Sequence, residues 1–150
     1  MKRTIRYQAA IIQNDHLLLL KATDFTDGQT FWVIPGGGRE EGETEADCVR
    51  REVLEETYLQ VKVERLLLDE PNIPDNIYQR FKTYLCQIVG GEARPGIEPE
   101  VDTADQVTIT AIGWFDLRQP SLWDPLALND PFTYPLLQRL RLALDYTGGE

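Results

Sequence analysis

Cysteine, histidine and long hydrophobic runs are all scarce in this 150-residue sequence, and each shortage excludes a class of protein. The longest apolar runs have four residues, as at residues 17–20, whereas a membrane-spanning helix needs about 20. The two cysteines, Cys48 and Cys86, are far from any histidine cluster, which favours reduced, partly buried thiols over a zinc site. His16 is the only histidine and falls in a predicted hairpin, so no Ser/His/Asp or Cys/His catalytic set is expected.

Positive charge is also scarce, with 15 Lys and Arg against 25 Asp and Glu, a formal net charge of −10. Nucleic-acid backbones are bound through Lys and Arg, so we expect no nucleic-acid polymer as a partner. The N-terminus lacks the apolar stretch of a signal peptide, which favours a cytoplasmic protein without membrane attachment. The length predicts one domain over residues 1–150, and 42% hydrophobic residues are enough to build its core.

The negative charge is concentrated in two short segments. Residues 39–56 hold eight acidic residues against three arginines, a net of −5. Residues 92–105 hold five acidic residues against one arginine, a net of −4. These segments therefore carry −9 of the −10, and each is either a solvated surface or part of a site.

Alternating apolar and polar residues from Ile5 to Ile11 predict a strand. A turn at Asn14-Asp15 and the apolar residues 17–20 predict the second strand of a hairpin. Because residues 17–20 are apolar on both faces, we expect the sheet to be covered on both sides. A short apolar segment follows at 31–34, and further strands are expected at 61–68, 77–89 and 106–115, with an acidic loop at 90–104.

Two segments are predicted to be helical. Thr44, with Asp47 three residues later, resembles a capping box and predicts the start of the first helix. The second helix is expected to begin near Tyr134–Pro135. Its apolar face comprises Leu136, Leu137, Leu140 and Leu144. Strands that flank one helix, with another helix at the C-terminus, predict an α/β fold with a mixed sheet between helices.

Glu52, Glu55 and Glu56 lie on one face of the first predicted helix, at spacings of three and four residues. Like charges at this spacing repel, and the helix dipole disfavours anions near a helix C-terminus. A solvated face with Arg51 paired to Glu55 explains one carboxylate but not three. Mg²⁺ prefers several carboxylate oxygens together with water and substrate phosphates, so the three residues predict a metal site.

The residues around this helix resemble the Nudix box, G-x5-E-x7-R-E-U-x-E-E-x-G-U, where U is aliphatic. Gly37, Glu43 and the segment from Arg51 to Leu59 match it at six of its seven fixed residues. Tyr58 stands where the family has glycine, which puts the end of the helix in question. The preceding Trp-Val-Ile-Pro-Gly-Gly run at 32–37 and the Trp-Phe-Asp-Leu run at 114–117 also look like the family. A triple glycine by itself is more often a turn than a site.

The resemblance implies a Nudix-type α/β/α sandwich and a Mg²⁺- or Mn²⁺-dependent hydrolysis of a diphosphate linked to another group. Glu52, Glu55 and Glu56 would be metal ligands, together with the carbonyl of Gly36. Glu52 would act instead, or in addition, as the base that activates water. Glu43 and Arg51 would form an ion pair that orients the ligand carboxylates.

In several members of the family a glutamate outside the box supplies another metal ligand or the general base. The acidic loop offers four acids for this role: Glu98, Glu100, Asp102 and Asp105. The Pro-Glu at 99–100 resembles the Pro-Glu before the final strand of some members, so Glu100 is the predicted residue. A solvated loop explains each of the four equally well.

Substrate contacts are predicted at Phe31, Arg80 and Lys82, although a core aromatic and a solvent-facing strand explain them equally well. No motif distinguishes a nucleoside triphosphate, a dinucleoside polyphosphate, ADP-ribose or a nucleotide sugar. Bound cations would allow so acidic a chain to bind a small anionic nucleotide. The protein is expected to be a monomer or a homodimer. Two other classes stay open: a nucleotide-binding or sensing module of the same fold, favoured only by Tyr58, and an acidic interaction domain.

Overall fold

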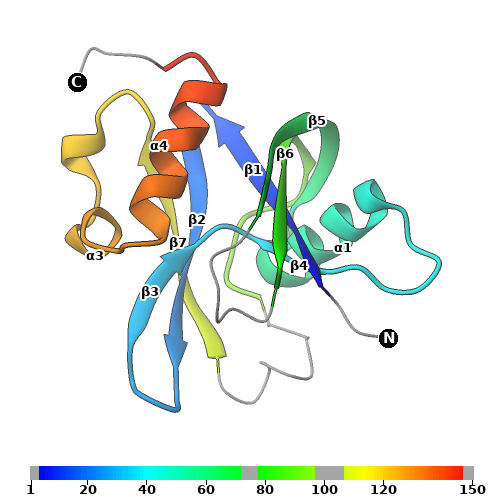
Figure 1. Ribbon diagram of the computed structural model, residues 1–150, viewed down its shortest axis with the longest axis horizontal. Helices are drawn as coiled ribbons and strands as arrows, with labels where there is room; N and C mark the ends of the chain where they lie inside the picture. The colour runs from blue at the N-terminus through cyan, green and yellow to red at the C-terminus, as the bar shows by residue number, and fades with distance from the viewer. Residues whose placement is uncertain (1–3, 72–77, 97–106, 147–150) are drawn as a thin grey trace.

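The structure, a computed structural model, describes residues 4–71, 78–96 and 107–146, and it places a sheet between helices (Figure 1). The strands are β1 (Ile5–Gln13), β2 (His16–Asp24), β3 (Thr30–Val33), β4 (Gly36–Gly38), β5 (Gln60–Pro71), β6 (Arg80–Gly90) and β7 (Val107–Asp116). The helices are α1 (Glu45–Thr57), α3 (Pro125–Leu128) and α4 (Thr133–Ala143), with a 3₁₀ turn, η1, at Pro120–Leu122. None of the described helices is long and apolar enough to cross a membrane.

The seven strands form one mixed sheet with the order β3-β2-β1-β6-β5, to which β4 adds by pairing with β1 and β7 by pairing with β2. The β1–β6 pair is parallel, and the other pairs are antiparallel. This confirms the α/β class and the mixed sheet predicted from the sequence. The β1–β2 hairpin turns at Asn14 and Asp15, whose φ angles of 52° and 63° suit the tight turn that joins twisted strands.

The sheet is buried on both faces, as the apolar residues of β2 predict. Leu18 and Leu20 pack into a core with Val49 and Val53 of α1. The intervening residues, Leu17 and Leu19, pack into a second core with the leucines of α4. Helices α1 and α4 therefore cover opposite faces of the sheet (Figure 1).

The triple glycine is a strand rather than the expected turn. Gly36 pairs with Gln8 and Gly38 with Arg6, so β4 adds to the sheet along the start of β1. A Cβ on Gly36 would lie 2.5 Å from the carbonyl oxygen of Tyr7, which explains why this strand needs glycine. Two smaller differences are that α4 begins at Thr133 and ends before Leu144, and that η1 and α3 were not predicted.

Candidate functional site

Helix α1 is fixed at both ends by local contacts. The side-chain oxygen of Thr44 accepts a hydrogen bond from the backbone N–H of Asp47 at 3.0 Å, so the predicted N-cap is present. At the other end Tyr58 takes the left-handed conformation, with φ 63° and ψ 15°, and its N–H donates to the carbonyl of Leu54. Tyr58 therefore ends the helix with the backbone geometry that a glycine would adopt.

Two of the three helix carboxylates are buried, and one of them contacts β4. Glu52 and Glu56 have exposed fractions of 0% and 1%. The backbone N–H of Gly36 donates to Glu56 Oε1 at 3.0 Å, which ties the first residue of β4 to the helix. A charged carboxylate is costly to bury unless hydrogen bonds or cations compensate it, so this pair of glutamates needs an electrostatic explanation.

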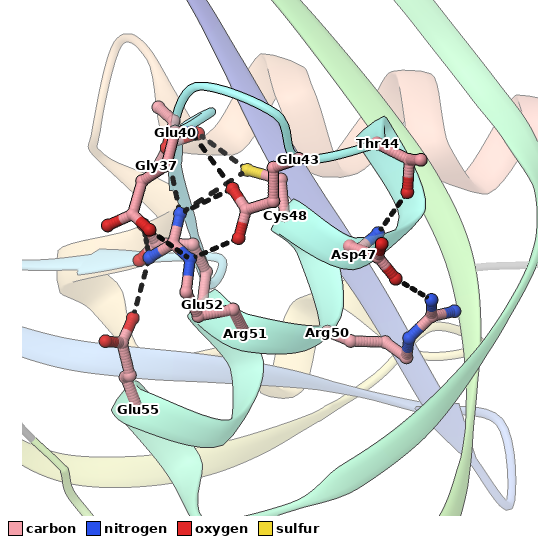
Figure 2. Close-up of polar contacts among 11 residues, drawn as sticks. Gly37, Glu40, Glu43, Thr44, Asp47, Cys48, Arg50, Arg51, Glu52 and Glu55 are labelled. Atoms are coloured by element: carbon pink, nitrogen blue, oxygen red, sulfur yellow. Dashed lines mark hydrogen bonds and ion pairs between the residues drawn. The ribbon is translucent and has the colours of Figure 1, made fainter.

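Arg51 supplies part of that compensation, because its guanidinium lies among the carboxylates of the box (Figure 2). It donates to both oxygens of Glu43, at 2.6 and 3.1 Å, and to Glu55 Oε1 at 2.9 Å. It also donates to Glu52 Oε2 at 3.2 Å and to the carbonyl of Gly38 at 3.1 Å. The hydrogen bonds between Arg51 and Glu43 lower the pKa of Glu43 and raise that of Arg51, so both stay charged near neutral pH.

The donor chemistry of this site fits a hard divalent cation, since Glu52, Glu55, Glu56 and the Gly36 carbonyl offer only oxygen atoms. Within the described ranges, no three His, Cys, Asp or Glu side chains are already arranged to hold a metal ion. The physical reason is visible in Figure 2, where Glu52 and Glu55 are both oriented toward Arg51. In the described structure the mutual placement of these residues is that of an arginine-centred ion-pair network.

Two of the three predicted substrate contacts form ion pairs with acidic residues of the protein. Lys82 forms its ion pair with Glu45 at the start of α1, at 3.3 Å. Arg80 pairs with Asp69 of the neighbouring strand, at 2.5 Å, and Phe31 lies half-buried on β3. The predicted loop acids Glu98, Glu100, Asp102 and Asp105 lie outside the described residues.

A backbone contact that the sequence did not predict closes the C-terminal end of α1. The N–H of Arg94 donates to the carbonyl of Thr57 at 3.0 Å, and the N–H of Gly96 donates to that of Glu56 at 2.8 Å. A Cβ on Gly96 would clash with the carbonyl oxygen of Glu55, so the glycine permits this approach. The sequence predicts this segment only as part of the acidic loop at 90–104. The contact satisfies carbonyls that a helix end leaves open, next to the carboxylates of the site.

Comparison with known proteins decides the family. A family model described as the NUDIX domain matches residues 3–140. The chain belongs to the Nudix family. The Nudix box of this member runs from β4 through α1 and contains the Arg51 network, and its Glu56 contacts Gly36, the residue directly before the box.

Similar proteins carry several activities in their names. The chain is 28% identical to diphosphoinositol polyphosphate phosphohydrolase 2 of Rattus norvegicus over 137 residues, covering 91% of this chain and 69% of that protein. It is 27% identical to an ADP-ribose pyrophosphatase from Streptococcus suis, with a TM-score of 0.66 and coverage of 97% and 91%. A NUDIX hydrolase from Nitrosomonas europaea, at 20% identity, shares the fold with a TM-score of 0.69 and coverage of 98% and 97%. These likenesses confirm the predicted Nudix-type fold.

Proposed function

We propose that this Nudix protein is a Mg²⁺-dependent pyrophosphohydrolase, with Mn²⁺ as a possible substitute, that cleaves a nucleoside diphosphate linked to another group. The observation that carries the proposal is the burial of Glu52 and Glu56 on α1 beside the Arg51 network. Family membership and the names of similar proteins support the general class, a hydrolase of diphosphate bonds.

The residues that would hold the metal are Glu52, Glu55, Glu56 and the carbonyl of Gly36. A bound divalent ion polarises phosphoryl oxygens and lowers the pKa of a bound water. The Gly36 N–H fixes Glu56 from the side of the sheet, and Arg51 orients Glu52 and Glu55 from the side of the loop. Glu43 in turn fixes Arg51, so the ligands are held by a second layer of charged contacts.

The chain's own chemistry would be proton transfer. Water attacks one phosphorus of the diphosphate, and the bond from that phosphorus to the bridging oxygen breaks, so the other phosphate leaves with this oxygen. A carboxylate accepts the proton that the water loses. Glu52 is the described candidate for that base, because burial makes a carboxylate more basic and because Arg51 orients this one through Oε2. Glu100 is the second candidate, from the acidic loop.

The substrate is proposed by class only. The named activities of the relatives have a phosphoanhydride in common, within ADP-ribose in one case and on an inositol phosphate in the other. We propose small-molecule diphosphates as the partners, with Arg80, Lys82 and Phe31 as substrate contacts. Arg80 and Lys82 would first have to release their ion pairs with Asp69 and Glu45. We also propose that the protein acts in the cytoplasm, as a monomer or homodimer.

The test is a hydrolysis assay with product identification over nucleoside triphosphates, dinucleoside polyphosphates, ADP-ribose, nucleotide sugars and a diphosphoinositol polyphosphate. We expect turnover with Mg²⁺, none with EDTA, and a large loss in Glu55→Gln. Glu64→Gln, an exposed glutamate of β5, is the matched control and should behave as wild type. No turnover on any substrate, with Glu55→Gln equal to wild type in Mg²⁺ binding, would overturn the proposal.

Two measurements separate the remaining classes. Tight nucleotide binding without turnover would make the protein a sensing module of the Nudix fold. An acidic interaction domain predicts that Mg²⁺ does not raise the melting temperature, whereas a metal site predicts a concentration-dependent rise.

A further inference from the structure

A row of three residues crosses the sheet beside the Nudix box. Gln8 of β1 lies opposite Gly36 of β4 on one side and opposite Thr83 of β6 on the other. Gln8 and Thr83 are both fully buried, with exposed fractions of 0%. Burial of an amide or a hydroxyl is unfavourable unless its hydrogen bonds are made, so polar side chains at these two positions need an explanation.

The side chain of Gln8 makes hydrogen bonds in two directions. Its Nε2–H donates to Thr83 Oγ1 at 3.0 Å, along the row. Its Oε1 accepts a hydrogen bond from Arg6 Nε at 2.9 Å, two residues earlier in β1. The buried amide therefore joins β6 to the guanidinium of Arg6 in one network.

Arg6 extends this network to the backbone just before the box. Its Nη2 donates to the carbonyl of Ile34 at 2.9 Å. The N–H of Ala9 donates to the next carbonyl along the chain, also at 2.9 Å. The N–H of Gly36 then donates to Glu56 at 3.0 Å. Three successive residues are thus held by one hydrogen bond each, two of them from β1 and one from α1.

Strand β4 needs such contacts because it consists of three glycines. It has no side chains of its own to pack, and glycine loses more conformational freedom on folding than any other residue. Gln8 lies directly against this strand, since a Cβ on Gly36 would be 3.2 Å from Gln8 Cγ. Gly36 is therefore backed by Gln8, while its N–H contacts Glu56 of α1.

We propose that Gln8 is a positioning residue of the metal site. Together with Arg6 and Thr83 it fixes the place of Gly36, and Gly36 in turn fixes Glu56. This inference rests on the proposed function, in which the Gly36 carbonyl and Glu56 are metal ligands. Gln8 touches neither the metal nor the substrate and acts through Gly36 alone.

Gln8→Met tests this role, because it removes both hydrogen bonds of the amide at similar side-chain volume. The probe is Mn²⁺ alone, titrated into the protein, with free Mn²⁺ measured by electron paramagnetic resonance. We expect Gln8→Met to bind Mn²⁺ at least about tenfold more weakly than wild type, as when other groups that orient metal ligands are removed. Thr83→Val should weaken Mn²⁺ binding less, because the bond from Arg6 to Gln8 remains. Thr83→Ser keeps the hydroxyl and should bind as wild type does.

The matched control is Thr30→Val, because Thr30 Oγ1 and Thr23 Oγ1 form a hydrogen bond of 3.1 Å between β2 and β3. Its loss should leave the Mn²⁺ affinity unchanged. A second readout needs no metal: NMR hydrogen exchange of the Gly36 N–H. We expect this exchange to be faster in Gln8→Met by more than the loss of global stability accounts for, and to follow global stability alone in Thr30→Val.

The outcomes separate this inference from the proposed function. Wild-type Mn²⁺ affinity in Gln8→Met, with binding lost in Glu55→Gln, would overturn the role of Gln8 and leave the metal site in place. No Mn²⁺ binding by the wild type would overturn both. An equal loss of affinity in Thr30→Val would also overturn the role of Gln8, because the effect would then be one of general stability. If Gln8→Met does not fold, equal affinities of Thr83→Val and Thr83→Ser overturn it instead.

Discussion

The two helices that cover the sheet end in opposite ways. Helix α4 places Arg141 in its last turn, where the dipole favours a cation, and buries Leu136, Leu137 and Leu140 against the sheet. Helix α1 has no basic residue in its last turn and carries carboxylates there instead. The comparison indicates that α4 is built for stability, whereas the end of α1 gives up stability to gather negative charge.

The surroundings of α1 limit that cost. Arg51 contacts Glu52 and Glu55, the Gly36 N–H contacts Glu56, and the N–H groups of Arg94 and Gly96 cap the last carbonyls. Each contact comes from a different part of the chain or a different turn of the helix. The carboxylates and the end of the helix that carries them are therefore held by contacts from inside and outside the box, and not by the helix alone.

Neutralising one carboxylate should separate activity from stability most strongly. We expect Glu52→Gln to lower kcat by about 10²–10⁴-fold, because it removes the proposed base and metal ligand. The melting temperature without metal should not fall, since the change relieves repulsion from Glu55 and Glu56 at nearly constant volume. Initial rates and thermal unfolding check this, with Glu64→Gln as the control. A lower melting temperature of metal-free Glu52→Gln would contradict the view that the carboxylates at the end of α1 reduce its stability.

The opposite result is expected on α4. Leu137 is fully buried, so Leu137→Ala should cost about 2–5 kcal/mol of unfolding free energy through lost burial and a cavity. Its kcat per folded molecule should match wild type. Leu142→Ala, on the same helix at 65% exposure, should change stability by less than about 0.5 kcal/mol. Urea unfolding and active-site-normalised rates measure both quantities, and a loss of kcat in Leu137→Ala would show that α4 also shapes the site.

Arg51→Lys tests a residue on which we expect both the stability of the protein and its kcat to depend. Lysine keeps the charge but cannot donate at once to Glu43, Glu52, Glu55 and the carbonyl of Gly38. We expect a loss of about 1–3 kcal/mol in stability together with a lower kcat, because both depend on these charged hydrogen bonds. Parallel unfolding and rate measurements check the coupling. Wild-type stability and wild-type kcat in Arg51→Lys would mean that only the positive charge of Arg51 matters, and not the geometry of its hydrogen bonds.

The parts of the molecule that the sequence predicted are those encoded locally. The Thr44 cap, the start of α1 and the Asn14-Asp15 turn each depend on residues a few positions apart. The two-sided burial of β2 also followed from one short apolar run. The Nudix box could be recognised in the sequence because all of its residues lie in one continuous segment, a loop followed by a helix.

The rest depends on partners distant in the sequence. The glycines of β4 form a strand only because β1 lies alongside, and Gly96 caps α1 only because a loop some 40 residues further on returns to the helix. The same holds for Lys82 and Arg80, whose carboxylate partners belong to α1 and β5.

The smallest expected effect concerns Tyr58, where this chain departs from the box. A left-handed tyrosine is strained by about 1 kcal/mol relative to glycine, but its ring lies under the guanidinium of Arg94, with Cζ 4.3 Å from the centroid. Such a stack contributes about 0.5–1 kcal/mol at an exposed site, so Tyr58→Gly should change stability by less than about 0.5 kcal/mol. A double-mutant cycle with Arg94→Ala isolates the stack: Arg94→Ala should destabilise the wild type and leave Tyr58→Gly unaffected. Equal effects of Arg94→Ala in both backgrounds would mean that only the backbone of 94–96 closes the helix, and that the tyrosine is tolerated rather than used.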